Sequence, residues 1–177
     1  DPRVIMIAQQ SPIDSFAALQ ASTTPVNFAT AGVGSASYVE TVIMFNGLKL
    51  PIKMLTGYNV NDDQLAMRRG EVAGAIGSRS TYEEFVRNGF GRMIVQIGGR
   101  NTDLPQLMPM LTDPKAKTLV ALIQSQGDIA RLTAGPAGIP ADRLAALRDA
   151  YRKALEDKEL QATAEKLERP VEPAYGD

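Results

Sequence analysis

The chain has 177 residues, and its 19 Lys and Arg against 20 Asp and Glu give it a formal net charge of −1. This near-neutral balance, with no basic block, argues against nucleic acid as a partner. The chain contains no His and no Cys, which excludes Ser-His-Asp catalysis, thiolate catalysis and the usual zinc sites.

Strands alternate with helices through the first part of the chain. Apolar runs predict strands at Val4–Ala8, Val26–Thr30, Ile52–Leu55, Val72–Ile76 and Met93–Ile97. Apolar residues at helical spacing predict helices at Phe16–Ala21, Tyr38–Phe45, Gln64–Arg69 and Thr81–Val86. This alternation favours an α/β fold with a parallel or mixed sheet and flanking helices, built from right-handed βαβ units.

Polar residues and glycines mark the ends of these helices. Asp14 or Ser15 can cap the first helix, and Asn61 or Asp62 can cap the third. Glycines in a left-handed conformation are expected to end the later three helices, at Asn46-Gly47, Gly70 and Asn88-Gly89.

The remainder of the chain is predicted to be mostly helical. A long loop, Gly98–Pro114, leads to a helix at Lys115–Gln124, a strand at Ile129–Thr133 and a rigid turn at Gly135–Pro140. A helix then begins near Pro140, and another is expected at Glu159–Leu167. The first of these two helices has an apolar stripe that we expect to be buried, formed by Leu144, Leu147, Tyr151 and Leu155.

The glycine-rich turn within Ala29–Ser37 is the most informative segment. It lies between a strand and a helix, where free backbone N–H groups and the helix dipole favour a carboxylate or a phosphate. Two other interpretations stay open. The turn can be a tight connection only, or Gly32-x-Gly34-x-x-Ser37 can be a degraded dinucleotide fingerprint, although the acidic residue expected about 20 positions later is missing.

Six short segments give the chain a family resemblance. Their order along the chain is Phe28–Ser35, Thr56–Tyr58, Leu65–Val72, Gln96–Gly99, Ala134–Pro140 and Asp142–Ala154. Together they resemble the extracytoplasmic solute receptors of tripartite tricarboxylate transporters. The resemblance implies a periplasmic binding protein-like fold of type II, in a two-lobed protein that closes on a small carboxylic acid and is read by a membrane permease.

The resemblance also implies where the ligand binds. The implied ligand-binding residues are Gly32, Val33, Gly34, Ser35 and Ser37 as a main-chain cradle, Tyr58 and Asn59 in the neighbouring turn, and Gly77 and Ser78 at the next strand end. Ligands do bind at the carboxyl ends of strands in open α/β sheets. Neither a catalytic residue nor a cofactor or metal is implied. Val60 and Ala73 depart from the family's usual pattern, so the acid is not identified.

Family members have another lobe ahead of the segment seen here, and this chain begins at Asp1-Pro2 rather than Met. We therefore expect a fragment or a shortened relative. Residues 1–130 would be the second lobe, and residues 131–177 a return segment that packs on the missing first lobe. One lobe alone is expected to bind ligand weakly, and the surface left by the missing lobe would favour self-association.

Two other functions are compatible with the sequence. The chain can be a one-lobed docking or dimerisation module without a ligand. It can also be an enzyme on an acidic substrate through Glu71 or Glu83, but the spacing pairs no two carboxylates on one face, so we expect that it is not an enzyme. Arg68 and Arg69 fit either an anion contact or a solvated helix end, and Tyr58 fits either a ligand contact or a rim aromatic.

Overall fold

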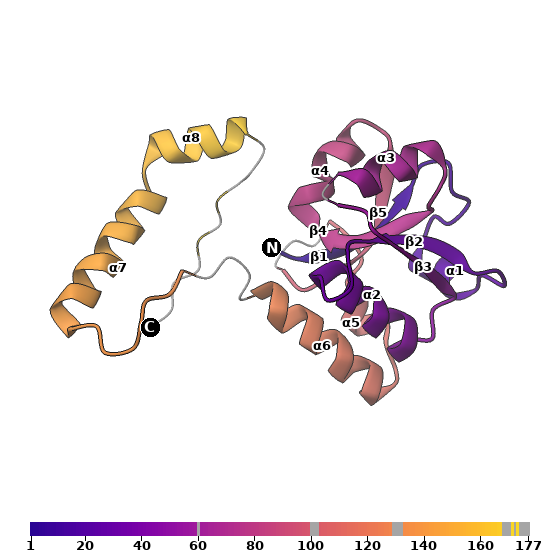
Figure 1. The fold of residues 1–177 in the computed structure, drawn as a ribbon, viewed down its shortest axis with the longest axis horizontal. Helices are drawn as coiled ribbons and strands as arrows, with labels where there is room; N and C mark the ends of the chain where they lie inside the picture. The colour runs from indigo at the N-terminus through magenta and orange to yellow at the C-terminus, as the bar shows by residue number, and fades with distance from the viewer. Residues whose placement is uncertain (60, 100–102, 129–132, 168–170, 172, 174–177) are drawn as a thin grey trace. The chain divides into compact units, whose positions relative to one another are not determined.

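The computed structural model describes residues 1–59, 61–99, 103–128, 133–167, 171 and 173. The chain forms two compact units, Asp1–Ala130 and Arg131–Asp177, whose elements are drawn in Figure 1. Within the described residues, no helix is both long and apolar enough to cross a membrane.

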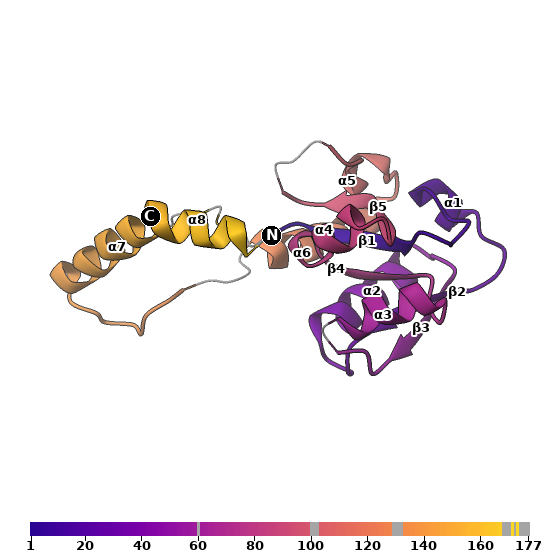
Figure 2. The same ribbon diagram turned by 90° about the horizontal axis from the view of Figure 1, so that it is seen from above.

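A mixed five-stranded sheet forms the centre of the first unit. The strands are β1 (Arg3–Ala8), β2 (Val26–Thr30), β3 (Ile52–Thr56), β4 (Gly74–Ser78) and β5 (Gly91–Ile97). Their order is β3-β2-β4-β1-β5, and Figure 2 shows β3 and β5 at opposite edges of the sheet. Strands β2, β3, β4 and β5 run in one direction and β1 runs in the opposite direction. The end of the sheet where these four strands finish and β1 begins is called here the carboxyl edge, and the other end is called the amino edge.

Helices cover both faces of this sheet. They are α1 (Phe16–Gln20), α2 (Ala36–Gly47), α3 (Asp62–Arg69), α4 (Arg79–Arg87), α5 (Leu107–Met110) and α6 (Pro114–Asp128). Figure 1 shows α3 and α4 above the sheet, with α2, α5 and α6 below it. The α/β fold with a mixed sheet and flanking helices is therefore confirmed.

Alternation along β1 explains why its sequence is a continuous apolar run. Ile5 and Ile7 pack with the cluster that includes residues of α1, α2 and α6, whereas Val4 and Met6 pack with α3 and α4. Both faces of the strand are buried, so an apolar side chain is required at every position.

Several helix ends form as the sequence predicts. Ser15 caps α1 by accepting from the Ala18 N–H, and Gly70 and Gly89 have the left-handed φ values of 76° and 74°. Asn61 precedes α3 but makes no side-chain cap hydrogen bond.

Helix α2 ends at Gly47 as predicted, but Gly47 is its last helical residue and does not have the expected left-handed conformation. A Cβ at position 47 would overlap the side chain of Leu119 in α6. The glycine therefore allows close helix packing, and the left-handed residue is Lys49 instead, at φ 52°. The fourth strand begins at Gly74 rather than Val72, and the predicted loop before α6 contains the short α5.

The second unit contains two helices in its described part, α7 (Ala141–Leu155) and α8 (Lys158–Lys166). Asp157 caps α8 by accepting from two backbone N–H groups. The predicted burial of the α7 stripe is wrong for this chain: no residue of α7 is buried, and Leu147 is 59% exposed. Two helices offer too little surface to cover such a stripe. The predicted strand at Ile129–Thr133 lies almost wholly outside the described residues.

Candidate functional site

The turn between β2 and α2 is braced by two serine hydroxyls. Ser35 is the N-cap of α2, and its Oγ accepts a hydrogen bond from the Tyr38 N–H at 3.2 Å. The Oγ of Ser37 accepts from the Ala31 N–H at 3.1 Å and lies 3.3 Å from the Ser35 Oγ. These hydroxyls are therefore used to hold the turn.

Backbone N–H groups remain available on the same turn. Within the described part of the chain, no hydrogen-bond acceptor is found for the N–H groups of Gly32, Val33, Gly34, Ala36 and Ser37. A Cβ built at Gly32 or Gly34 would meet no atom within 4 Å, so the space beside the turn is open. Gly34 has a φ of 87°, which disfavours any residue with a side chain. With the dipole of the 12-residue α2, this arrangement suits an anion.

The turn after β3 lies next to this glycine turn. β2 and β3 are parallel, with Thr30 opposite Thr56, and the Tyr58 N–H donates to the Thr30 carbonyl at 3.1 Å. Asn59 is exposed, and its N–H donates to Asp62 Oδ2 at 3.1 Å. Tyr58 is half-buried and packs against the cluster under α3 and α4.

Gly77 and Ser78 end β4, on the other side of β2 in the sheet. A Cβ at Gly77 would come within 2.7 Å of the Tyr82 ring, so this glycine makes room for that buried tyrosine. The Ser78 Oγ accepts a hydrogen bond from Arg3 Nη1 at 2.5 Å. Both residues therefore have a structural role at the carboxyl edge of the sheet, whether or not they contact a ligand.

A buried ion pair that the sequence did not indicate joins these two parts of the edge. Arg3 donates from Nε and Nη2 to Glu40 Oε2, at 3.0 and 2.6 Å, and Glu40 in α2 is 1% exposed. Burial raises the pKa of Glu40, while the charge and hydrogen bonds of Arg3 lower it. Arg3 thus connects α2 to Ser78 in β4 through one guanidinium. The only sequence signal was a glutamate one helical turn before Met44, on the buried face of α2.

Tyr82 and Thr30 are two further buried polar groups of the first unit. The Tyr82 hydroxyl donates to Asp63 Oδ2 at 2.6 Å, which ties α4 to α3, and burial raises the pKa of Tyr82 well above its ordinary value. Thr30 Oγ1 is buried at the end of β2 and is the one such side-chain atom, among the described residues, without a hydrogen-bond partner. A buried hydroxyl without a hydrogen-bond partner calls for a specific explanation, such as a bound water or a functional site.

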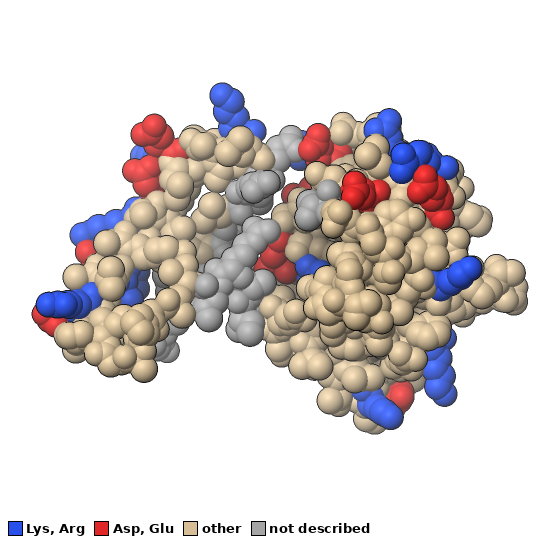
Figure 3. Space-filling view, viewed as in Figure 1, with Lys and Arg blue, Asp and Glu red and all other residues tan. Residues whose placement is uncertain are grey.

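The two carboxylates of the enzyme alternative lie apart, Glu71 between α3 and the start of β4, and Glu83 within α4. Glu71 is paired with Arg69 at 2.8 Å and Glu83 with Arg79 at 3.1 Å, so both carboxylates of the enzyme alternative hold structural ion pairs. No three carboxylates of the described chain are placed to hold a metal ion. Figure 3 shows both signs of charge scattered over the visible face of the first unit.

The fold matches those of solved solute-binding proteins. A TctC solute-binding protein from Polaromonas is 11% identical, with a TM-score of 0.57 over 72% of this chain and 51% of that one. The Rpa4515 protein of R. palustris, with adipate, is 12% identical, with a TM-score of 0.62 over 93% and 55%. MatC of Rhodopseudomonas palustris, with bound malate, is 18% identical, with a TM-score of 0.59 over 90% and 54%.

These comparisons establish the fold. The predicted resemblance to tripartite tricarboxylate receptors is confirmed at the level of the fold, because the structural neighbours include a TctC solute-binding protein and the periplasmic binding protein BugD. This chain spans about half the length of the structures it matches. No protein-family model and no curated protein sequence matches it.

Proposed function

We propose that residues 1–130 are the ligand-binding lobe of a periplasmic receptor that captures a small carboxylic acid. The observation that carries this proposal is the set of unpaired N–H groups at the start of α2, in an open turn held rigid by serine hydroxyls. The fold supports it, since two structural neighbours were solved with adipate and with malate.

Main-chain groups would do the binding. The carboxylate accepts hydrogen bonds from the N–H groups of Gly32, Val33 and Gly34 and from the first N–H groups of α2, where the dipole adds to the attraction. Ser35 and Ser37 would hold the turn in shape, and four residues would line the site beside it: Tyr58, Asn59, Gly77 and Ser78. Binding of this kind needs no cofactor, metal or catalytic residue.

The rest of the receptor would come from outside this lobe. A first lobe would close over the bound acid, residues 131–177 would return to it, and a membrane permease would read the closed form. Closure buries most of a small ligand's surface, so the chain as given should bind weakly, with a dissociation constant well above that of the complete receptor.

A docking or dimerisation module is the second candidate, and one observation favours it. Leu147 and Tyr151 of α7 are 59% and 47% exposed, and apolar side chains of this size on one helix face promote association. Sedimentation over a range of protein concentrations tests it. A strict monomer would remove this candidate.

Thermal unfolding at rising adipate concentration, at constant ionic strength, tests ligand capture. A ligand that binds only the folded state raises Tm, so adipate should raise it and the uncharged diamide of adipic acid should not. In a chain that also carries Arg68→Gln, which removes an exposed guanidinium, Gly34→Ala should abolish the increase. Gly70→Ala is the matched control, because Gly70 also has a positive φ with no tight neighbour but ends α3. An adipate effect that persists when Gly34→Ala is combined with Arg68→Gln would contradict the proposal.

A further inference from the structure

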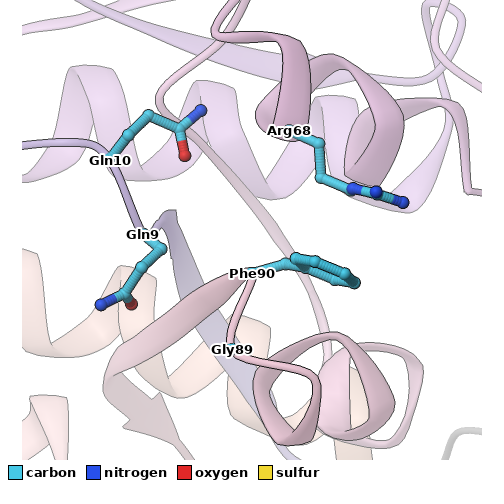
Figure 4. A pocket seen from close by; sticks show the side chains of 5 residues that line it. All are labelled: Gln9, Gln10, Arg68, Gly89 and Phe90. Carbon is cyan, nitrogen blue, oxygen red and sulfur yellow. The ribbon is translucent and has the colours of Figure 1, made fainter.

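A shallow pocket lies at the edge of the sheet opposite the glycine turn. It has a volume of about 400 Å³ and is lined by Gln9, Gln10, Arg68, Gly89 and Phe90 (Figure 4). These residues follow the end of β1, end α3 and precede the start of β5. Because β1 runs against the other strands, the end of β1 marks their amino edge. This pocket, called here the Arg68 pocket, is thus separate from the site proposed above.

The guanidinium of Arg68 is held in place without being neutralised. Its Cζ lies 4.1 Å from the centroid of the Phe90 ring, and Figure 4 shows the two planar groups side by side. Stacking occupies a face of the guanidinium and leaves its N–H donors free in the plane. Among the described residues, Arg68 has no hydrogen-bond or ion-pair partner.

Hydrogen bonds and aromatic packing support the surface beneath Arg68. Phe90 donates its N–H to the Phe85 carbonyl at 3.1 Å and accepts from the Gln9 N–H at 3.0 Å. Its ring centroid is 5.7 Å from that of Phe85, which is buried. On the other side, the Gln10 carboxamide donates to the Met67 carbonyl. A side chain stacked on such a support loses little freedom when it binds a partner.

Three other arginines of the first unit have partners within the chain. Arg69 pairs with Glu71 at 2.8 Å, Arg79 pairs with Asp103 at 2.6 Å, and Arg92 donates to the backbone carbonyls of the loop after β1. No carboxylate lines the Arg68 pocket. The pocket therefore combines an oriented guanidinium with no internal partner for it.

We infer that the Arg68 pocket is a second carboxylate-binding site. A carboxylate would accept two parallel N–H bonds from Arg68, while the Phe90 ring keeps the guanidinium in position. The carboxylate can belong to a free organic acid or to an acidic side chain of a protein partner. An exposed ion pair alone contributes little, so a peptide that also contacts the surrounding surface should bind more tightly than a free acid.

NMR titrations of the ¹⁵N-labelled chain test this site. The probes are sodium acetate, sodium chloride at equal ionic strength, and two acetylated, amidated Gly-Phe-Xaa-Gly peptides with Asp or Asn as Xaa. We expect saturable shifts of the Arg68 Nε–H, Gly89 and Phe90 signals with acetate and the Asp peptide only. The ligand concentration at the midpoint of the titration should be at least about fivefold lower for the Arg68 signal than for the Arg69 signal, because Arg69 is already paired with Glu71.

Variants separate this site from a general charge effect. Arg68→Gln and Phe90→Leu should remove the saturable shifts at Gly89, whereas Arg69→Gln should leave them. A lower midpoint for the Asp peptide than for acetate assigns the site to a protein partner, and equal midpoints assign it to free acids. Shifts that chloride or the Asn peptide reproduce, or that survive Arg68→Gln in the folded variant, would overturn the inference.

Discussion

The two edges of the sheet offer positive charge by different means. At the carboxyl edge, backbone N–H groups around Gly34 are unpaired, while the nearby side chains of Ser35 and Ser37 hold the turn. At the amino edge, the backbone of Phe90 is paired and the side chain of Arg68 is not. A backbone site depends on the conformation of a turn, whereas a side-chain site depends on one residue. The two should therefore respond differently to mutation.

The largest effect on stability is expected from substitution of Arg3, which joins α2 to β4 beside the glycine turn. Arg3→Met leaves Glu40 buried without its partner, and loss of one partner of a buried pair costs about 3–5 kcal/mol. Urea unfolding at neutral pH measures this loss. Lys153→Met is the control, because the Asp149–Lys153 pair is exposed and its removal should leave the free energy of unfolding unchanged.

The loss of unfolding free energy in Arg3→Met should depend on pH. Burial raises the pKa of Glu40 above its ordinary value of 4.5, so its contribution is fully present below pH 4.5 and is lost as the pH rises through the folded-state pKa. Removing Arg3 removes both influences that lower this pKa. The deficit of Arg3→Met should therefore be largest at neutral pH and shrink as the pH falls toward 4.5. A constant deficit would contradict this account of Glu40.

A smaller effect is expected at Gly34. Alanine at its φ of 87° costs about 1–2 kcal/mol in backbone strain, and Gly70→Ala should cost a similar amount. Adipate distinguishes the two variants: when each is combined with Arg68→Gln, which removes the second site, only Gly34→Ala should lose the increase of Tm with adipate. Equal responses in the two variants would place the adipate site elsewhere.

Ser37→Ala should have a smaller effect still. It removes the acceptor for the Ala31 N–H, a loss of about 1 kcal/mol, and it loosens the turn so that adipate binds severalfold more weakly. Ser125→Ala removes a similar hydroxyl on the exposed side of α6 and should change neither quantity. Unaltered adipate affinity in Ser37→Ala would show that this hydroxyl does not shape the cradle.

The smallest change in stability is expected in the second unit. Leu147→Ser replaces a side chain that is 59% exposed, so the free energy of unfolding should change by less than about 0.5 kcal/mol. If α7 mediates association, the sedimentation coefficient at high protein concentration should fall in this variant. Unchanged self-association would exclude Leu147 from the interface.

Local sequence signals predicted much of the fold. The five strands and the caps at Ser15 and Gly70 were predictable because apolar runs and capping residues act over a few neighbouring positions. The true role of Gly47 was not predictable, because it depends on Leu119 in a distant helix. The exposure of the α7 stripe likewise depends on which surfaces are present to cover it.

The candidate site was predictable only in part. The strand, glycine turn and helix around Gly34 form as expected, and that local geometry follows from the sequence. Arg3 and Glu40 were missed because they are 37 positions apart and meet only in the folded sheet. That Gly32–Ser35 bind an acid stays a prediction, since backbone N–H groups leave no side-chain pattern to identify their ligand.

Amide mapping by NMR tests the central claim most directly. The ¹H–¹⁵N signals of Gly32, Val33, Gly34, Ala36 and Ser37 are followed while adipate is added to the Arg68→Gln variant, which removes the second site. Saturable downfield shifts confined to this turn and the adjoining residues Tyr58 and Asn59 are the predicted result. Saturable shifts elsewhere, or none at adipate concentrations in the tens of millimolar, about where a 2–3 kcal/mol interaction saturates, would contradict it.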